Sequence, residues 1–434
     1  MTLPLVVFAI TGLLVFLSVL IKPNIYVGRV KLGSYWVISL VGALVLLIFG
    51  TVPLDYLFES LTSSDAINPI KILILFFSMT ALSVFLDEIG FFSYLANFAL
   101  RKVGKSQIKL FIYLYITVSV LTVFTSNDIV ILTFTPFICL FSKNAKINPL
   151  PYLFAEFVAS NSWSMLFIIG NPTNIYLASS AGIGFIEYFL VMAIPTVMAG
   201  AVSILMLLLI FKKSLKSEIS ATVAPEKIKD KVSLALGIEH LALCTVLLAV
   251  SSYLHFEMYL ISALFALSLF LFIIAVSLSR KKPLAPLVST VKRLPYELVP
   301  FVLSMFVIVL SLNYCGASEK FASLLFSANP IFTIGLSSFF SSNVINNIPM
   351  SVLFSSLVGT QSGSASYLPA VYSAVIGSNL GALFTPVGAL AGIMWASILR
   401  RFDVKLSFKK FILYGAAISI PALVAALLGL CIVF

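Results

Sequence analysis

The sequence predicts an all-α protein that crosses a membrane many times, and three observations lead to this fold class. Apolar residues make up 61% of the 434 residues, whereas Asp, Glu, Lys and Arg together make up only 10%, compared with roughly 25% in an average soluble domain. Long apolar stretches recur along the whole chain, and the basic residues gather between them. So few charges cannot cover a soluble protein of this size, which argues against a soluble enzyme and against a nucleic-acid partner.

The first apolar stretch, residues 3–21, is predicted to be a retained membrane span and not a cleaved signal peptide. No basic residue precedes it, no small-residue cleavage site stands before Lys22, and its length suffices for a bilayer core of roughly 30 Å. The later apolar stretches are predicted to be spans, hairpins or broken spans, and they lie at residues 34–52, 70–100, 110–142, 149–180, 185–211, 235–254, 258–279, 297–315, 330–358, 368–399 and 411–433.

The 27 Lys and Arg residues are distributed unevenly between these stretches. All except Lys71 and Lys320 fall in loops that a single orientation places on one side of the membrane. Because basic loops stay in the cytoplasm, this bias predicts a multi-pass protein of the cell (inner) membrane with both termini outside. The net charge of +11 then reflects orientation and not a polyanionic partner.

Two stretches have the same kind of flank at both ends and are predicted to be re-entrant hairpins. Residues 110–142 lie between basic loops, which favours a hairpin from the cytoplasmic side with its tip near residues 125–128. Residues 330–358 have flanks almost without positive charge, which favours a hairpin from outside with its tip near residues 341–347. Since unpaired backbone groups are costly in lipid, such tips must line a protein cavity. The total is ten crossings and two hairpins.

Three landmarks recur in the same order in the two halves of the chain. They are SMTALSVFLDEIG (78–90) with SMFVIVLSLNYCG (304–316), FTSNDI (124–129) with FSSNVI (340–345), and GNPTN (170–174) with GSNLG (377–381). Five crossings and one hairpin per half are an odd number of spans, so the second repeat is predicted to be inverted. The repeats are residues 1–211 and 235–434, joined by a cytoplasmic linker at 212–234. Broken helices that meet at mid-membrane are typical of secondary transporters.

The tips and breaks place small uncharged hydrogen-bonding groups at the membrane centre, where helix termini also point. The predicted substrate-binding residues are Ser126, Asn127, Thr173, Asn174, Ser342, Asn343, Asn379 and Thr385. No Lys or Arg falls within these segments. A polyanion such as citrate would therefore need helix N-termini and co-bound cations, so the pattern favours a solute that is uncharged when bound.

Ionisable residues inside a bilayer are costly and are functional candidates. Asp128 follows the first tip, with no acidic counterpart at Val344, and it is predicted to couple transport to an ion; Glu156 is the second candidate. Asp87 and Glu88 are expected in mid-span as structural contacts. No catalytic residue, metal site or cofactor is predicted, because the four Cys residues lie far apart; the coupling ion is a proton or a sodium ion.

Three segments carry a resemblance to a known family: LDEIGFF (86–92), SNDIVILTFTP (126–136) and GSNLGALFTPVGALAGIMW (377–395). With them the chain resembles the arsenite/antimonite permeases, within the ion-transporter superfamily that also holds citrate and sodium/dicarboxylate carriers. The resemblance implies a scaffold with a mobile substrate-carrying part, and arsenite or antimonite efflux driven by proton entry. It matches Asn127, Asp128, Asn343 and Asn379 to family site motifs. It also allows a homodimer and, for an arsenite exporter, a cytoplasmic ATPase partner.

Other functions stay open at this point. GNPTN (170–174) is similar to the citrate-transporter branch, and Ser-Asn at both tips is similar to the sodium/dicarboxylate carriers, so a sodium- or proton-coupled carrier of citrate or dicarboxylates is the first alternative. A membrane-embedded hydrolase would need Asp128 and Glu156 to converge. A channel is the third alternative, disfavoured by the paired breaks.

Overall fold

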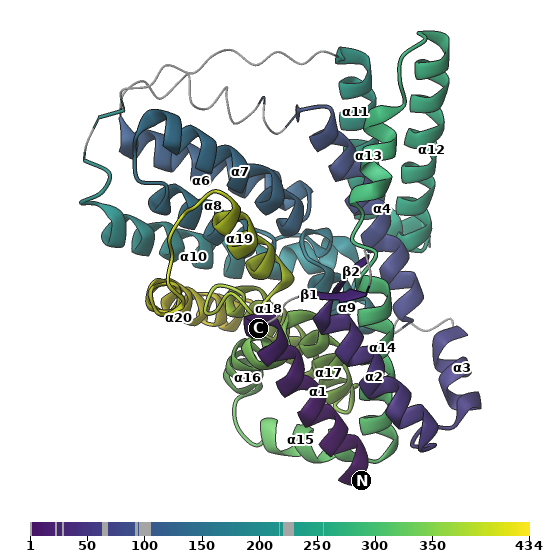
Figure 1. Ribbon diagram of the computed structural model, residues 1–434. Coiled ribbons are helices and arrows are strands. Elements are labelled where there is room, and N and C mark those ends of the chain that lie inside the picture. Colours follow the sequence, from purple (N-terminus) through teal and green to yellow (C-terminus); the bar gives the residue numbers. More distant parts are fainter. Residues whose placement is uncertain are drawn as a thin grey trace.

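The computed structural model describes residues 2–21, 24–27, 30–62, 68–91, 94, 106–216, 218–219, 230–254 and 256–434. Within these ranges the chain is almost entirely helical, which confirms the predicted all-α membrane fold (Figure 1). Eight of the described helices are long and apolar enough to cross a bilayer. A small antiparallel hairpin of β1 (Asn24–Val27) and β2 (Val30–Gly33) follows the first helix, where the sequence predicted only a basic loop.

The first half consists of α1 (Thr2–Ile21), α2 (Ser34–Ile48), α3 (Leu54–Thr62), α4 (Pro69–Glu88), α6 (Gln107–Phe124), α7 (Asn127–Ala145), α8 (Leu150–Trp163), the 3-10 turn η1 (Ile168–Gly170), α9 (Pro172–Ser180) and α10 (Phe185–Phe211). The second half consists of α11 (Lys231–Leu254), α12 (Met258–Ser279), α13 (Ala285–Arg293), α14 (Leu298–Tyr314), α15 (Ala317–Leu325), α16 (Pro330–Ile345), α17 (Asn347–Gly359), α18 (Tyr367–Gly381), α19 (Leu390–Arg401) and α20 (Phe408–Val433).

The two halves have a similar order of elements. Each contains two long helices, a short helix (α3 or α13), a further long helix (α4 or α14), a hairpin (α6–α7 or α16–α17), a broken span and a final long helix with an internal proline. The predicted inverted orientation of the halves, their boundaries and the count of ten crossings stay predictions. Residue 217 and residues 220–229 of the predicted linker lie outside the described residues, and α11 begins at Lys231.

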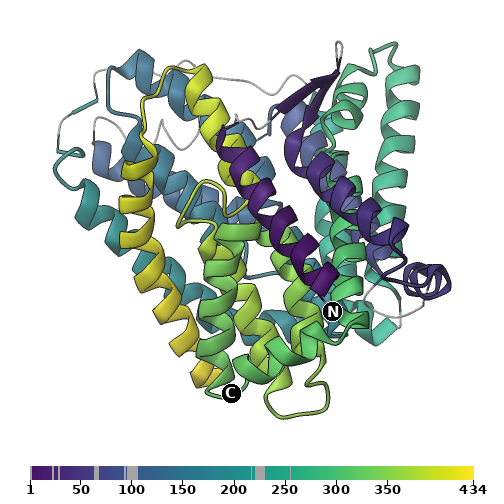
Figure 2. The same cartoon turned by 60° about the horizontal axis from the view of Figure 1, so that its bottom comes forward.

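The helices form two groups, and each group takes members from both halves. One group holds α1, α2, α4, α11, α12 and α14, and the other holds the two hairpins, the broken spans, α10 and α20. The first group lies on the right of Figure 1 and most of the second lies on the left. In Figure 2 the β1–β2 hairpin is at the top, whereas both chain ends are near the bottom. The candidate functional site lies where the two groups meet.

Close helix packing fixes the second hairpin against α18. A Cβ atom on Gly377 would lie 2.4 Å from the backbone oxygen of Gly335, and one on Gly381 would lie 2.7 Å from the backbone oxygen of Phe339. Only glycine permits this approach of α16 and α18. The predicted break at residues 377–381 is therefore wrong by about one turn: α18 continues to Gly381, and the irregular segment is residues 382–389.

Two other predictions also need correction. Asp87 and Glu88 lie at the C-terminal end of α4 and not in mid-span. The second arms of the hairpins begin at Asn127 and Asn347, so the match of Asn127 with Asn343 is displaced by about one helical turn. Sequence identity at FTSNDI and FSSNVI was misleading because the helix breaks at a different point in each.

Candidate functional site

A cavity of about 470 Å³ lies between the two groups of helices, beside the tip of the first hairpin. It is bordered by α4, by the start of α7, by the connection from α13 to α14 and by α19. Its hydroxyl-bearing and charged lining residues are Tyr35, Thr80, Ser126, Asp128, Arg293, Tyr296, Glu297, Ser397 and Arg400. The rest of the lining is mainly aliphatic, as expected for a small-molecule site with a few convergent polar groups.

The tip of the first hairpin brings Ser126 and Asp128 to this cavity. Helix α6 ends at Phe124, Thr125 and Ser126 adopt extended backbone conformations, and α7 starts at Asn127. Ser126 is the N-cap of α7, but its side chain makes no capping hydrogen bond. Asp128 lies in the first turn of α7, where the helix dipole favours a carboxylate. A free hydroxyl and a carboxyl therefore face the same space.

Asn127 has an oxygen atom without a partner. Its Nδ2 donates to Asn161 Oδ1 at 3.1 Å, and Asn161 Nδ2 donates to the carbonyl of Phe157 at 2.8 Å. Because that carbonyl can only accept, it fixes the orientation of both amides. Asn127 Oδ1 is thus a buried acceptor with no hydrogen-bond donor among the described residues.

Similar buried oxygen atoms without partners occur at both tips, at the first break and in α18 about one turn before the second break. Among the described residues they are Ser126 Oγ, Asn127 Oδ1, Thr173 Oγ1, Asn347 Oδ1 and Ser378 Oγ. Thr80 Oγ1 on α4, across the cavity, is a further one. Buried polar groups are rarely left unpaired, and such groups in a folded protein point to a missing ligand or water. Asn347 and Ser378 belong to the tip and the break that the sequence predicted to form the site, whereas Thr80 was not predicted.

Asn379 and Asn174 lie together and are hydrogen-bonded within the protein, and Asn379 uses all of its hydrogen-bonding capacity there. Asn379 Oδ1 accepts from Ser164 Oγ at 3.0 Å and from Asn171 Nδ2 at 2.9 Å. Its Nδ2 donates to Asn174 Oδ1 at 2.7 Å and to the carbonyl of Val375. Asn174 Nδ2 in turn donates to two carbonyls of the first break. This network joins the broken spans of the two halves.

Asn343, Thr385 and Ser342 form a second internal network at the second hairpin. Asn343 Oδ1 accepts from the backbone N–H of Thr385 at 3.0 Å and from Thr385 Oγ1 at 2.6 Å. Asn343 Nδ2 donates to the carbonyl of Gly381 at 3.0 Å, and Ser342 Oγ donates to the carbonyl of Phe339 at 2.8 Å. These side chains hold the irregular segment 382–389 against α16.

Glu156 is fully buried and lies outside the lining of the cavity. Its Oε1 lies 3.0 Å from Thr135 Oγ1 of α7, and its Oε2 accepts from Trp395 Nε1 of α19 at 3.2 Å. A hydrolase with two carboxyls would need Glu156 and Asp128 in one groove. The cavity is lined by Asp128 and not by Glu156, so the two carboxyls do not share it.

Two arginines border the cavity, although no Lys or Arg lies in the segments predicted to form the site. Arg293 Nη2 lies 2.7 Å from Asp87 Oδ2, and Nη1 lies 2.5 Å from Glu88 Oε1, so its charge is balanced by two carboxylates. Arg400 is exposed and forms no ion pair within the described part of the chain. Tyr35 donates to Glu297 at 2.9 Å across the same region. These residues come from segments distant in sequence, so no local motif could reveal them.

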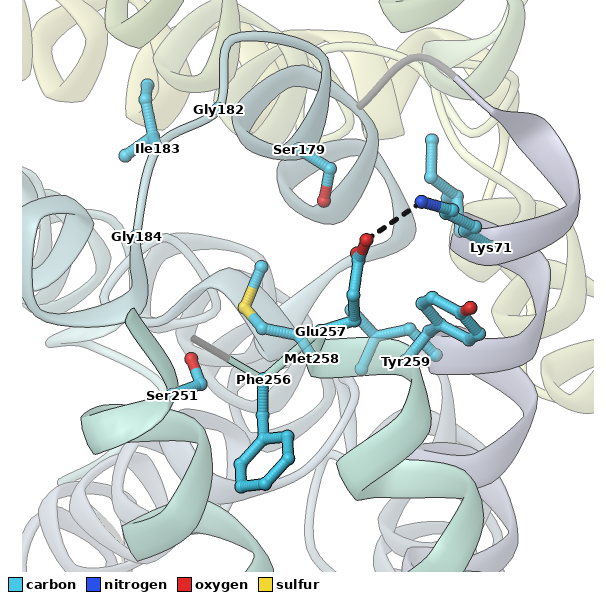
Figure 3. Close-up of a pocket in the computed structure, with 12 residues that line it drawn as sticks. Lys71, Ser179, Gly182, Ile183, Gly184, Ser251, Phe256, Glu257, Met258 and Tyr259 are labelled. Atoms are coloured by element: carbon cyan, nitrogen blue, oxygen red, sulfur yellow. Dashed lines mark hydrogen bonds and ion pairs between the residues drawn. The ribbon is translucent and has the colours of Figure 1, made fainter. Parts of the chain in front are cut away.

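Two further cavities lie away from the first hairpin tip. One of about 300 Å³ is bordered by α3, α9, α14 and α17 and includes Tyr176, Asn313 and Ser356. Another of about 390 Å³ contains the ion pair of Lys71 Nζ with Glu257 Oε1 at 2.9 Å (Figure 3). The described residues contain no group of three or more His, Cys, Asp or Glu side chains placed to hold a metal ion.

A membrane-embedded helical protein with paired hairpins, broken spans and a cavity at their junction has the architecture of a secondary transporter. Residues 15–372 match the citrate transporter family (CitMHS), and the chain belongs to this family. It is a multi-pass membrane transporter.

Similar proteins carry transporter names as well. The arsenical pump membrane protein of Escherichia coli K12 is 26% identical over 368 residues, which cover 82% of this chain and 84% of the relative. An uncharacterized transporter of Mycobacterium tuberculosis H37Rv is 26% identical, with 81% and 84% coverage. The crystal structure of the Alcanivorax borkumensis YdaH transporter matches with a TM-score of 0.59 at 13% identity, over 99% of this chain and 98% of that chain. The last comparison supports the fold.

Proposed function

We propose that this protein is a secondary transporter that exports neutral oxyacids of the arsenite and antimonite type in exchange for protons. It lies in the cell inner membrane with inverted halves and both termini outside. The cavity beside the first hairpin then opens to the cytoplasm, because Arg293 and Arg400 at its border belong to basic clusters at the ends of α13 and α19. The names of the similar proteins support transport and not catalysis.

The observation that carries this proposal is the set of unpaired oxygen atoms at the tips and breaks. Asn127 lies between Ser126 and Asp128, which line the cavity, and its Oδ1 can only accept hydrogen bonds. The same holds for Asn347 Oδ1 at the second tip, outside the lining of this cavity. A neutral trihydroxy acid brings O–H donors and fits such acceptors, whereas an ionised carboxylate brings only further acceptors. Burying an anion against these oxygens would leave both sides unpaired, which costs about 1–3 kcal/mol for each group. The site therefore favours the neutral solute.

Asp128 is the proposed coupling residue because it lines the cavity next to the free hydroxyl of Ser126. In the ionised state its carboxylate accepts a hydrogen bond from an O–H group of the solute. A proton that arrives from outside occupies the same carboxylate and releases the solute there. The proton then leaves to the cytoplasm when the empty carrier returns. One proton enters for each solute exported, and no bond in the solute is oxidised or reduced.

A sodium- or proton-coupled carrier of citrate or dicarboxylates is the second candidate. The family description and the cavity position of Arg400, which makes no ion pair among the described residues, favour it. In this case Arg400 would bind a substrate carboxylate.

Flux measurements in proteoliposomes separate the two candidates. Purified protein is reconstituted, and uptake of arsenite, antimonite, citrate and succinate is measured with an imposed pH gradient or sodium gradient. The proposal expects arsenite and antimonite uptake that depends on the pH gradient and does not respond to sodium. Citrate or succinate uptake without any response to arsenite would reject it in favour of the second candidate.

A further inference from the structure

We propose that Glu156 is a second proton-binding site of this transporter, filled in this structure, and that its proton holds α7 against α8. The role of this proton in transport rests on the proposed proton-driven function. Its presence on Glu156 follows from the local geometry alone. Glu156 is distinct from Asp128, because Asp128 lines the cavity and Glu156 does not.

Thr135 has two oxygen neighbours and only one hydroxyl hydrogen, and this shows which group carries a proton. A threonine hydroxyl has one hydrogen to donate. Thr135 Oγ1 lies 2.6 Å from the carbonyl oxygen of Ile131 and 3.0 Å from Glu156 Oε1. The Ile131 carbonyl can only accept, and it is the nearer of the two oxygens, so it takes the hydrogen of Thr135. The contact of Thr135 with Glu156 is then a hydrogen bond only if Glu156 supplies the hydrogen.

The other oxygen of Glu156, Oε2, accepts a hydrogen bond from α19. Trp395 Nε1 lies 3.2 Å from Oε2, and an indole N–H can only donate. Oε2 is therefore the carbonyl oxygen of the acid, and Oε1 carries the proton and donates to Thr135. With this assignment Glu156 uses its donor and an acceptor, and Thr135 and Trp395 are satisfied as well.

The surroundings of Glu156 contain nothing that would balance a negative charge. Within the described residues, no Lys, Arg or His forms an ion pair with it. The rings of Phe154, Phe157 and Phe411 pack around Trp395. On the helices packed against α8, the buried titratable side chains are a thiol and phenols: Cys139 of α7, Tyr115 of α6, Tyr188 of α10 and Tyr372 of α18. Cys139 is the one whose electrostatic environment includes Glu156.

The position of Glu156 connects it to the cavity through its two partners. Thr135 belongs to α7, which brings Asp128 and Leu132 to the cavity, and Trp395 belongs to α19, which brings Met394 and Ser397. If Glu156 lost this proton, no hydrogen would lie between Glu156 Oε1 and Thr135 Oγ1, so the two oxygen atoms would repel each other. The carboxylate would also be a buried charge. The contact between α7 and α8 would then open. On the other side, Trp395 borders a separate cavity of about 300 Å³ that includes Arg400 and Ser407.

Infrared difference spectroscopy on the purified protein tests the protonation state without any transport. The acid C=O stretch of wild-type protein should lose one buried component in Glu156→Gln, whose amide keeps both hydrogen bonds. Trp395→Phe should move that component to higher frequency, because its C=O loses a donor. The matched control is Glu187→Gln, an exposed carboxylate on α10, which should leave the component in place. If Glu156→Gln removes only carboxylate bands, Glu156 is ionised and the proposal is overturned.

The pH dependence of flux tests the role in the cycle. In proteoliposomes, Glu156→Gln should reduce the slope of log arsenite flux against pH by about one, as expected when one titrating proton is lost. Glu187→Gln should not change this slope. A wild-type pH profile in Glu156→Gln would overturn the assignment to the transport cycle. If no oxyacid is transported by the wild-type protein, the proposed function fails, and the infrared component still decides the protonation of Glu156. If Glu156→Gln does not fold, the frequency shift in Trp395→Phe carries the test.

Discussion

The two hairpins occupy similar places in the order of elements, but their tips use polar side chains in opposite ways. At the first tip, Ser126 and Asn127 keep oxygen atoms without partners, and Asp128 faces the cavity. Near the second tip, Asn343 and Asn346 bind the carbonyls of Gly381 and Val387 and so hold the segment 382–389. At the second tip only one buried oxygen atom, Asn347 Oδ1, is left without a partner among the described residues. Asparagine residues near a tip can thus either hold the fold, as Asn343 and Asn346 do, or keep an open oxygen atom that we propose serves the solute.

This difference shows that the role of an asparagine at a helix break, structural contact or solute ligand, can be inferred only when its hydrogen bonds are counted. Asn343 makes five hydrogen bonds with its two polar side-chain atoms, whereas Asn127 makes one. Free capacity, and not residue type, distinguishes a site for a solute from a structural contact.

The packing of the second hairpin should tolerate no added side chain at Gly377. In Gly377→Val, a Cβ atom would lie 2.4 Å from the oxygen of Gly335 and 2.8 Å from the nitrogen of Phe339, which are backbone atoms and cannot yield cheaply. We expect loss of most folded protein, measured by size-exclusion chromatography of a fluorescent fusion. The control is Gly359→Val at the end of α17, where a Cβ atom meets nothing within 4 Å. Normal yields of both variants would contradict the close packing.

The charge at the first tip should matter for coupling and not for folding. Asp128→Asn keeps the size and the helix position but removes the proton-binding group. We expect loss of the flux driven by a pH gradient, by a factor of roughly 100 or more, as for other groups that move protons. Exchange of solute without net proton movement should persist. Asp55→Asn on α3, an exposed carboxylate, is the control and should transport normally. Gradient-driven flux in Asp128→Asn would reject the coupling role.

How far the sequence predicted this arrangement depends on whether a signal is local. The bounds of α10 and α12 match the predicted stretches 185–211 and 258–279, because an uninterrupted apolar run of this length forms a single membrane-spanning helix. The short helices α3, α13 and α15 were missed, since their polar faces interrupt the apolar pattern. The first hairpin breaks at its predicted tip.

The cavity was harder to predict because its walls come from both halves of the chain. Ser126 and Asp128 belong to a recognisable segment, but Tyr35, Thr80 and Arg400 reach the cavity only through tertiary packing. Gly377 and Gly381 were assigned to a break because GSNLG (377–381) aligns with GNPTN (170–174) of the first half. Their small size instead serves contact between α18 and α16, which one sequence without its partner helix cannot reveal.

The two asparagines should give opposite results in stability and flux. Asn343→Ala leaves the N–H of Thr385 and the carbonyl of Gly381 without partners, and it should lower the free energy of unfolding by about 3 kcal/mol. Asn127→Ala loses one hydrogen bond, to Asn161, and should cost about 1 kcal/mol. It should nevertheless reduce arsenite flux about tenfold, since it removes a proposed ligand group. Thermal melting and flux together give the comparison; equal melting temperatures would contradict the hydrogen-bond count.

A charge outside the membrane should affect stability slightly and transport not at all, in contrast to Asp128. Burial raises the pKa of Asp230, but hydrogen bonds from Lys282 and Ser233 outweigh it, so the pKa lies below its ordinary value. The ion pair with Lys282 Nζ at 2.9 Å is therefore fully present above the unfolded-state pKa of about 4. Its contribution is lost as the pH falls through the lower folded-state value.

Because this pair is partly exposed, its contribution should be only a few tenths of a kcal/mol. Asp230→Asn keeps an oxygen for the backbone N–H of Val232, so the start of α11 is retained and only the charge is lost. The melting temperature of wild-type protein should fall slightly more than that of the variant when the pH is lowered past 4, while arsenite flux near neutrality stays the same. Reduced flux in Asp230→Asn would mean that transport responds to any acidic group near a helix start. The effect of Asp128→Asn would then reflect the loss of a charge and not the place of Asp128 at the cavity.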